Sequence, residues 1–255
     1  MLEEMDWRLQ GVVVLDSVAE VDGGTQESPS ERVMTSVDAV RLQDGRLLAF
    51  AIPNPSAMML DASKRAFDAA QQLFAHESLK CAPRGFVQFP SNADAVDFAE
   101  HLIVSVLTAY TALECFANEN IPPWLTYKKV DRKGETPRML AKEQIEREVN
   151  LGVKLAVVLP QVFGVESPKG TSDWEAFVKL EKVRNRVVHM KHDDRRSGDV
   201  GVDTIWKALL TVASPYHAAK KLMDRFLCSV PHIPGLEFEN CRPVRPRWHV
   251  ECPHK

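Results

Sequence analysis

One helical stretch constrains the fold of this chain most, the segment 173–189 with the sequence DWEAFVKLEKVRNRVVH. Thr171 and Ser172 are suitable N-cap residues, and Glu175 would complete a capping box with Ser172. At about 100° per residue, the apolar side chains form one broad face, which is typical of a helix packed on a core. Arg184 falls inside that face. The apolar residues are Phe177, Leu180, Val183, Val187 and Val188.

Arg184 is an unusual residue for such a face. Its guanidinium cannot lose its charge, so an Arg that points at a core must be paired with a carboxylate or must face an anion. Asn185 and His189 are i, i+4 neighbours at the edge of the same face. The sequence therefore places an Arg, an Asn and a His at one end of a buried helix.

The segment 184–189 resembles the Arg-polar-x-x-x-His motif of the HEPN superfamily, all-helical domains common in RNA-cleaving toxins and defence proteins. Arg186 and His192 also fit the loose Arg-to-His spacing, but only Arg184 is followed by the polar residue that the family prefers. Further segments resemble these domains in their order along the chain, and together the resemblance covers roughly residues 90 to 229. These segments are 108–119, 143–147, 159–164 and 174–180.

The resemblance implies a metal-independent endoribonuclease without a cofactor. His189 would act as general acid or base, Arg184 would bind the phosphate bidentately, and Asn185 would orient the phosphate or the imidazole. Attack by the 2′-hydroxyl would leave 2′,3′-cyclic phosphate ends. Because HEPN nucleases form their site between two subunits, the resemblance also implies a homodimer that acts on RNA. A defence or toxin setting would add an antitoxin or another regulatory partner.

Two alternatives remain beside this hypothesis. Arg184 and Glu114 could form an ion pair between two helices, with His189 favoured at a helix C-terminus by the macrodipole. The chain would then be a catalytically silent module that binds RNA or a nucleotide or that dimerises, or a scaffold whose N-terminal sheet recruits another protein. In the nuclease, Glu114 would hold the guanidinium or support His189 as a base, with Asn118 one turn further on. Glu114 could equally be a partly exposed charge at a helix edge.

Two groups of cations could guide an RNA backbone, although charge runs are often just solvated surface. Trp124 and Tyr127 could stack on a base or pack on the bundle. The cations are Lys128, Lys129, Arg132 and Lys133 in one loop, and Arg186, Lys191 and His192 after the motif.

Periodicity predicts a mainly α fold, an up-and-down helical bundle of HEPN type with a small N-terminal antiparallel β-meander and an extended C-terminal tail. Residues 1–56 would form the β region, packed on the body, with a hairpin at Gln43-Asp44-Gly45. Residues 57–230 would form the bundle and 231–255 the Pro-rich tail. The strands are expected at 11–15, 37–42 and 46–52, and the helices at 61–75, 92–118, 136–162 (with a break near 150–152), 172–190 and 203–229, kinked at Pro215.

Composition excludes several classes of function. A net charge of −3 argues against a surface built entirely for nucleic acid. We find no apolar run of membrane length and no basic leader, and the five cysteines are odd in number and irregularly spaced, so we expect reduced thiols in a cytoplasm. The group Cys241, His249, Cys252 and His254 fits none of the paired zinc patterns, so we expect no metal site. Phosphate-loop, dinucleotide-binding, nucleophile-elbow and zincin motifs are all missing.

Overall fold

A computed structural model describes Arg8 and residues 11–15, 31–35, 37–75, 79–81, 86–130, 136–195 and 204–228. These residues divide into two compact units, and the boundary lies between Met58 and Met59. The predicted loop at 22–30 and the predicted tail at 231–255 lie outside the described residues. The packing of the β region on the helical body therefore stays a prediction.

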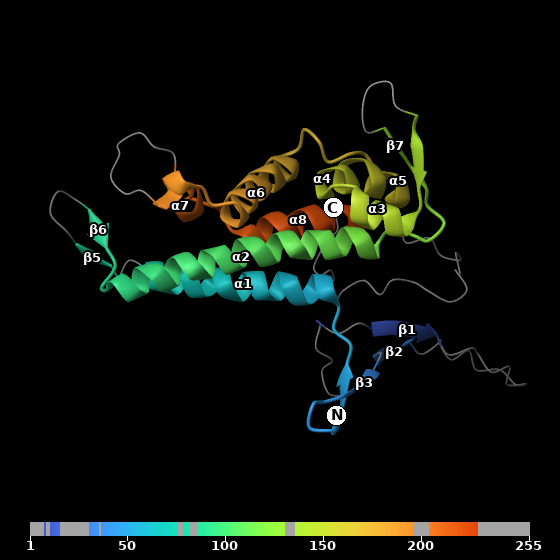
Figure 1. Cartoon of the computed structure of the whole chain (residues 1–255), viewed down its shortest axis with the longest axis horizontal. Coiled ribbons are helices and arrows are strands. Elements are labelled where there is room, and N and C mark those ends of the chain that lie inside the picture. The colour runs from blue at the N-terminus through green and yellow to red at the C-terminus, as the bar shows by residue number, and fades with distance from the viewer. Residues whose placement is uncertain are drawn as a thin grey trace, which may run out of the picture. The chain divides into compact units, whose positions relative to one another are not determined.

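The first unit contains two separate antiparallel pairs of strands (Figure 1). β1 (Gly11–Leu15) pairs with β2 (Glu31–Thr35), and β3 (Val37–Arg41) pairs with β4 (Leu47–Ala51). The predicted hairpin is confirmed, and Gly45 takes the φ of +86° that its tight turn requires. The single three-stranded meander is wrong, because β2 forms from a segment whose charged start, Glu-Arg, hides its strand character.

The second unit is mainly helical, as predicted (Figure 1). Its longest helix, α2, packs against α6, α7 and α8. The helices are α1 (Pro55–Phe74, which begins in the first unit), α2 (Asn92–Glu119), α3 (Lys142–Glu148), α4 (Leu151–Val153), the π-helix η3 (Lys154–Val158), α5 (Leu159–Phe163), α6 (Ser172–Val188), the 3-10 helix η4 (His192–Arg195), α7 (Ile205–Leu210) and α8 (Pro215–Cys228).

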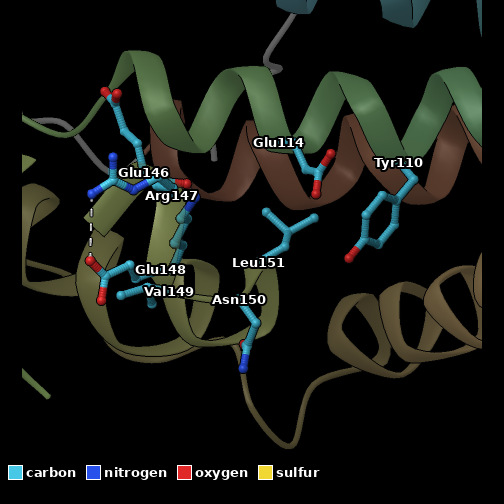
Figure 2. A pocket seen from close by; sticks show the side chains of 9 residues that line it. Tyr110, Glu114, Glu146, Arg147, Glu148, Val149, Asn150 and Leu151 are labelled. Carbon is cyan, nitrogen blue, oxygen red and sulfur yellow. Dashed lines mark hydrogen bonds and ion pairs between the residues drawn. The ribbon is translucent and has the colours of Figure 1, made fainter. Parts of the chain in front are cut away.

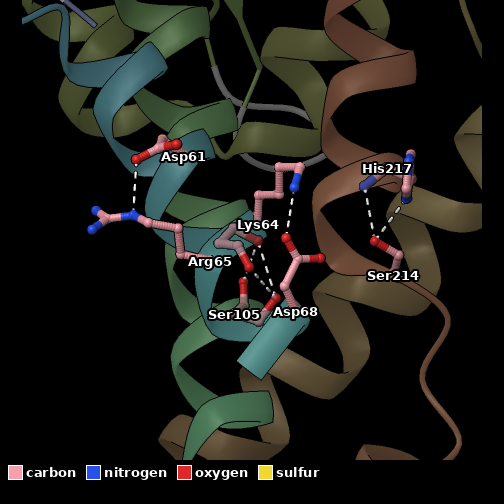
Figure 3. Close-up of polar contacts among 8 residues, drawn as sticks. Asp61, Lys64, Arg65, Asp68, Ser105, Ser214 and His217 are labelled. Atoms are coloured by element: carbon pink, nitrogen blue, oxygen red, sulfur yellow. Dashed lines mark hydrogen bonds and ion pairs between the residues drawn. The ribbon is translucent and has the colours of Figure 1, made fainter. Parts of the chain in front are cut away.

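The centre of the unit is built on α2. Ser91, rather than Asn92, caps the helix, because its hydroxyl accepts a hydrogen bond from the Asp94 backbone N–H at 3.1 Å. Ser63 of α1 and Ser105 of α2 exchange hydrogen bonds at 2.9 Å, each hydroxyl donating to the other residue's carbonyl. Figure 3 labels Ser105 at this contact. The buried residues of α2 are Phe98, Leu102, Ser105, Val106, Ala109, Tyr110, Ala112, Leu113, Phe116 and Ala117.

By length and composition alone, α2 could cross a membrane. The expectation that no apolar segment reaches the length of a membrane span is corrected on this point. The contacts of α2 with α4, α6, α7 and α8, and with Ser63 of α1, explain its apolar character without a membrane, since a core helix is also apolar over much of its surface.

Two predicted helices are corrected. Arg138–Leu140 is not helical but forms β8, which pairs with β7 (Tyr127–Lys129) and buries Leu140, so α3 starts only at Lys142. The segment predicted as one kinked helix is two helices, α7 and α8. Pro215 begins α8 instead of kinking a longer helix, since its missing N–H and fixed φ suit a first turn.

A short antiparallel pair of strands, β5 (Lys80–Cys81) and β6 (Val87–Gln88), lies before α2 in the chain.

The motif helix is α6, as predicted. Thr171 is its N-cap and accepts a hydrogen bond from the Trp174 N–H at 3.3 Å. Four of the five predicted core residues are buried, but Val188 is 49% exposed because it is the last residue of the helix. The helix therefore delivers its C-terminal end, which carries the motif, to the surface.

Candidate functional site

Arg184 lies half-buried on α6, against an aromatic ring of α2. Its guanidinium carbon is 4.6 Å from the centroid of the Tyr110 ring, and its Nη1 donates a hydrogen bond to Asn185 Oδ1 at 3.0 Å. A cation over an aromatic face gains about 0.5–2 kcal/mol without being neutralised. Arg184 forms no ion pair with any residue that the structure describes. The guanidinium is therefore positioned but keeps its full charge.

The alternative pairing of Arg184 with Glu114 is not formed. Glu114 is half-buried on α2, one turn after Tyr110, and makes no hydrogen bond or ion pair within the described ranges. Tyr110 takes the place that the sequence analysis gave to Glu114. A contact between an Arg and an aromatic ring leaves no charge complementarity to detect in a sequence, which is why it was missed.

Asn185 and His189 are both exposed. His189 is the C-cap of α6, with φ −118° and ψ 49°, and its backbone N–H donates to the Asn185 carbonyl at 3.0 Å. The Asn185 side chain is engaged with Arg184, so it holds the guanidinium rather than the imidazole. The structure thus joins Arg184 and Asn185 directly and leaves the imidazole of His189 open to solvent.

Tyr110 links this group to a neighbouring carboxylate. Its hydroxyl donates to Glu181 Oε1 at 3.3 Å, and its ring stacks on Phe177 with centroids 6.4 Å apart. Burial, followed by the negative charges of Glu181 and Glu114, raises the pKa of Tyr110 to about 12, while Arg184 acts in the opposite direction. The phenol therefore stays a neutral hydrogen-bond donor at ordinary pH.

An open cavity of about 360 Å³ lies beside Tyr110 and Glu114 (Figure 2). Its other walls are residues 146–151 and Lys154. Lys154 is only 4% exposed, although sequence alone gives no reason to place a lysine in a core. The cavity was not predicted, and the single cation in the apolar run 151–160 was the signal that could have indicated it.

Lys154 is the first residue of the π-helix η3, and such insertions are frequent at functional sites. Its Nζ donates to Asn118 Oδ1 at 2.8 Å and to the Glu146 carbonyl at 2.6 Å. Burial lowers the pKa of the Lys154 ammonium, and the charges of Glu114 and Glu146 act in the opposite direction. Asn118, predicted as a supporting residue of the motif, thus supports Lys154 instead.

The cations after the motif fall into two kinds. Arg186 forms an ion pair with the buried Asp194 at 3.2 Å, whereas Lys191 and His192 are exposed. The Asp194 carboxylate also accepts the backbone N–H of Lys191 at 2.9 Å and that of Ile205 at 2.7 Å. This carboxylate therefore fastens the segment that follows His189 to the start of α7.

The predicted basic loop is partly a hairpin, β7–β8. Lys128 is exposed on it, whereas the Lys129 ammonium donates to the Glu148 carbonyl at 3.2 Å. Arg132 and Lys133 lie outside the described residues. Trp124 is 74% exposed, so it does not pack on the bundle, while Tyr127 is half-buried.

Within the described ranges, no group of three or more His, Cys, Asp or Glu side chains could hold a metal ion. Cys81 and Cys115 carry free thiols. The group Cys241, His249, Cys252 and His254 lies outside the described part of the chain.

Comparisons of the chain with protein-family models, with curated proteins and with solved structures found no match. The resemblance to HEPN domains therefore rests on the motif residues of this chain and on the order of the segments around them.

Replacement of Asp194 by Asn should lower the melting temperature, because an amide cannot accept all three of the hydrogen bonds that the carboxylate accepts. The Lys191 and Ile205 N–H groups, followed by the Arg186 charge, hold the pKa of Asp194 below its model-compound value of 3.8. Its contribution to stability is therefore complete above pH 3.8 and is lost as the pH falls through the lower folded-state value. Between neutral and acid pH, the melting temperature of the Asp194→Asn variant should fall by less than that of the parent. The variant Asp97→Asn, at an exposed position, should behave like the parent. Equal curves of melting temperature against pH for all three proteins would refute the stabilising role of Asp194.

Replacement of Tyr110 by Phe should remove a tyrosine that ionises near pH 12. The chain has three tyrosines, and burial also raises the pKa of Tyr216, so the phenolate absorbance of the Tyr110→Phe variant is compared with that of a Tyr216→Phe variant. Because the folded-state pKa is raised from 10.0, the contribution of Tyr110 to stability is complete below pH 10.0 and is lost as the pH rises towards about 12. The control Tyr127→Phe should retain the late-ionising group. Loss of an early-ionising group from the Tyr110 variant would contradict the assignment.

Proposed function

We propose that this protein is a metal-independent endoribonuclease of HEPN type that acts in the cytoplasm in a defence or toxin role. The observation that carries the proposal is the half-buried Arg184, held by Tyr110 and Asn185 without a carboxylate partner in the described part of the chain. A fixed cation that is left without a counter-charge suits an anionic ligand, and Arg suits a phosphate best. His189 follows at the exposed end of the same helix.

The chemistry uses these side chains together with a proton donor from a second copy of the chain. His189 removes the proton of the ribose 2′-hydroxyl, the 2′-oxygen attacks phosphorus, and the bond to the 5′-oxygen breaks. Arg184 stabilises the charge that builds on the non-bridging oxygens, and Asn185 keeps the guanidinium in place. The leaving 5′-oxygen needs a proton from the side opposite the attack, which a second copy of the chain supplies in a homodimer. The product carries a 2′,3′-cyclic phosphate and a 5′-hydroxyl.

A second candidate is a catalytically silent module that binds RNA or a nucleotide, or that dimerises. One observation favours it: among the described residues, no side chain or carbonyl hydrogen-bonds the His189 imidazole. A catalytic histidine usually has a partner that fixes its tautomer and orientation. In the nuclease, that partner would come from the substrate or from the second subunit, and an antitoxin or another regulator would restrain the activity.

A cleavage assay with total RNA in EDTA separates the two candidates. We expect His189→Ala to reduce the cleavage rate about 10²–10⁴-fold, the usual contribution of a general acid or base. Arg184→Lys should also lose activity, because an ammonium cannot bind two phosphate oxygens in fork geometry. His101→Ala, on α2 outside the site, is the matched control. Equal cleavage by the parent and His189→Ala would refute the nuclease, and silence from every variant would favour the binding module.

A further inference from the structure

The cavity beside Tyr110 has the size of a small-molecule site, and its walls are mostly polar. Its volume of about 360 Å³ is at the lower end of the range of about 300–1,000 Å³ for ligand pockets, which suits a nucleobase or nucleoside. Figure 2 shows Tyr110 and Glu114 extending from α2 towards the turn that carries Asn150 and Leu151. The polar groups of the wall therefore come from two separate segments of the fold.

Most charges in this wall are already compensated. Glu148 is paired with Arg138 at 3.1 Å and with Arg147 at 3.7 Å, and Glu146 is paired with Lys142 at 3.6 Å. Glu114 differs from them because it accepts no hydrogen bond from any described residue. Its carboxylate presents two acceptor oxygens in a half-buried position, where leaving them without donors costs free energy.

Lys154 provides the complementary donor. An ammonium has three N–H groups, and two of them are used by Asn118 Oδ1 and by the Glu146 carbonyl. These two neutral acceptors fix the position of Nζ without cancelling its charge. One N–H is therefore left for a ligand. The Lys154 side chain lines the cavity, and the residue is only 4% exposed.

A carboxylate without a donor and an ammonium held by two neutral acceptors, both lining one small cavity, select a ligand with two adjacent N–H donors beside an acceptor. Among the RNA bases only guanine has this edge: N1–H and N2–H can donate to the two carboxylate oxygens, and O6 or N7 can accept from the ammonium. Adenine and uracil each present only one N–H donor group on the corresponding edge. Cytosine does not present two adjacent N–H donors beside an acceptor. We infer that this cavity is a guanine-recognition pocket, in which Glu114 accepts from N1–H and N2–H and Lys154 donates to O6.

Tyr110 connects the pocket to the proposed phosphate site. Tyr110 lines the cavity, and its ring also contacts the Arg184 guanidinium, whose carbon is 4.6 Å from the ring centroid. In this inference a nucleotide binds with its phosphate at Arg184 and its base in the cavity. The inference rests on the proposed function for the role of Arg184 and deepens it, because it names guanosine as the nucleotide beside the scissile phosphate.

The test is calorimetric titration of the full chain with guanosine, inosine and adenosine 5′-monophosphates. Inosine lacks only the N2 amine of guanosine, so the difference in affinity between the two nucleotides measures one hydrogen bond to a carboxylate. Since a hydrogen bond to a charged group contributes about 1.5–3 kcal/mol, we expect inosine monophosphate to bind about tenfold or more weakly than guanosine monophosphate. Adenosine monophosphate should be weaker still, because its N6 amine would face the Lys154 ammonium.

Variants assign the effect to single residues. Glu114→Gln should bind guanosine monophosphate about tenfold more weakly and should no longer separate it from the inosine nucleotide. Glu100→Gln removes the same charge from an exposed position of α2 and should change neither affinity. Lys154→Met should weaken both 6-oxo purines, provided that its circular dichroism and melting temperature match the parent; Glu114→Gln decides the question if they do not.

Equal affinity for the three nucleotides, or no binding of any, would overturn the pocket. The result of this binding test is independent of the result of the cleavage assay. His189→Ala should bind guanosine monophosphate as the parent does while losing cleavage. Cleavage without guanine discrimination would leave the nuclease standing and reject the pocket, whereas discrimination without cleavage would support the pocket within a binding module.

Discussion

The contact between the Arg184 guanidinium and the Tyr110 ring determines how the two halves of the candidate site are arranged. An aromatic face holds a cation in place without supplying a negative charge, which an ion pair with Glu114 would have done. The site therefore keeps a positive charge at Arg184 of α6 and a negative charge at Glu114 of α2, with Tyr110 contacting the first and lining the cavity beside the second. A nucleotide, with an anionic phosphate and a hydrogen-bonding base, has the chemistry that this separation suits.

The helix α2 makes this arrangement possible, because residues four apart lie on one face. Tyr110 contacts α6, Glu114 lines the cavity, and Asn118 holds Lys154 at the start of the π-helix. Tyr110 and nine further residues of α2 are buried. One helix thus fixes groups from two distant segments of the chain, and a shift of α2 would disturb the phosphate site and the cavity together.

The helices α2 and α6 could be predicted from sequence because capping residues and apolar periodicity are local signals. The strand at Arg138–Leu140 could not, since its partner, Tyr127–Lys129, lies across a loop and only the pairing makes it a strand. The motif residues Arg184, Asn185 and His189 were found through resemblance, but their partners depend on contacts between helices. Tyr110 and Lys154 were not predicted as site residues, because an aromatic residue on an apolar helix face and one lysine in an apolar run carry no motif.

The central claim is that Arg184 binds a backbone phosphate. The most direct measurement is the salt dependence of binding to a single-stranded DNA oligonucleotide, which lacks the 2′-hydroxyl and is not cleaved. Each phosphate contact contributes about −0.7 to the slope of log affinity against log salt concentration on single strands. We predict that Arg184→Gln binds more weakly than the parent and with a slope shallower by about 0.7. Identical slopes and affinities for the two proteins would contradict the account.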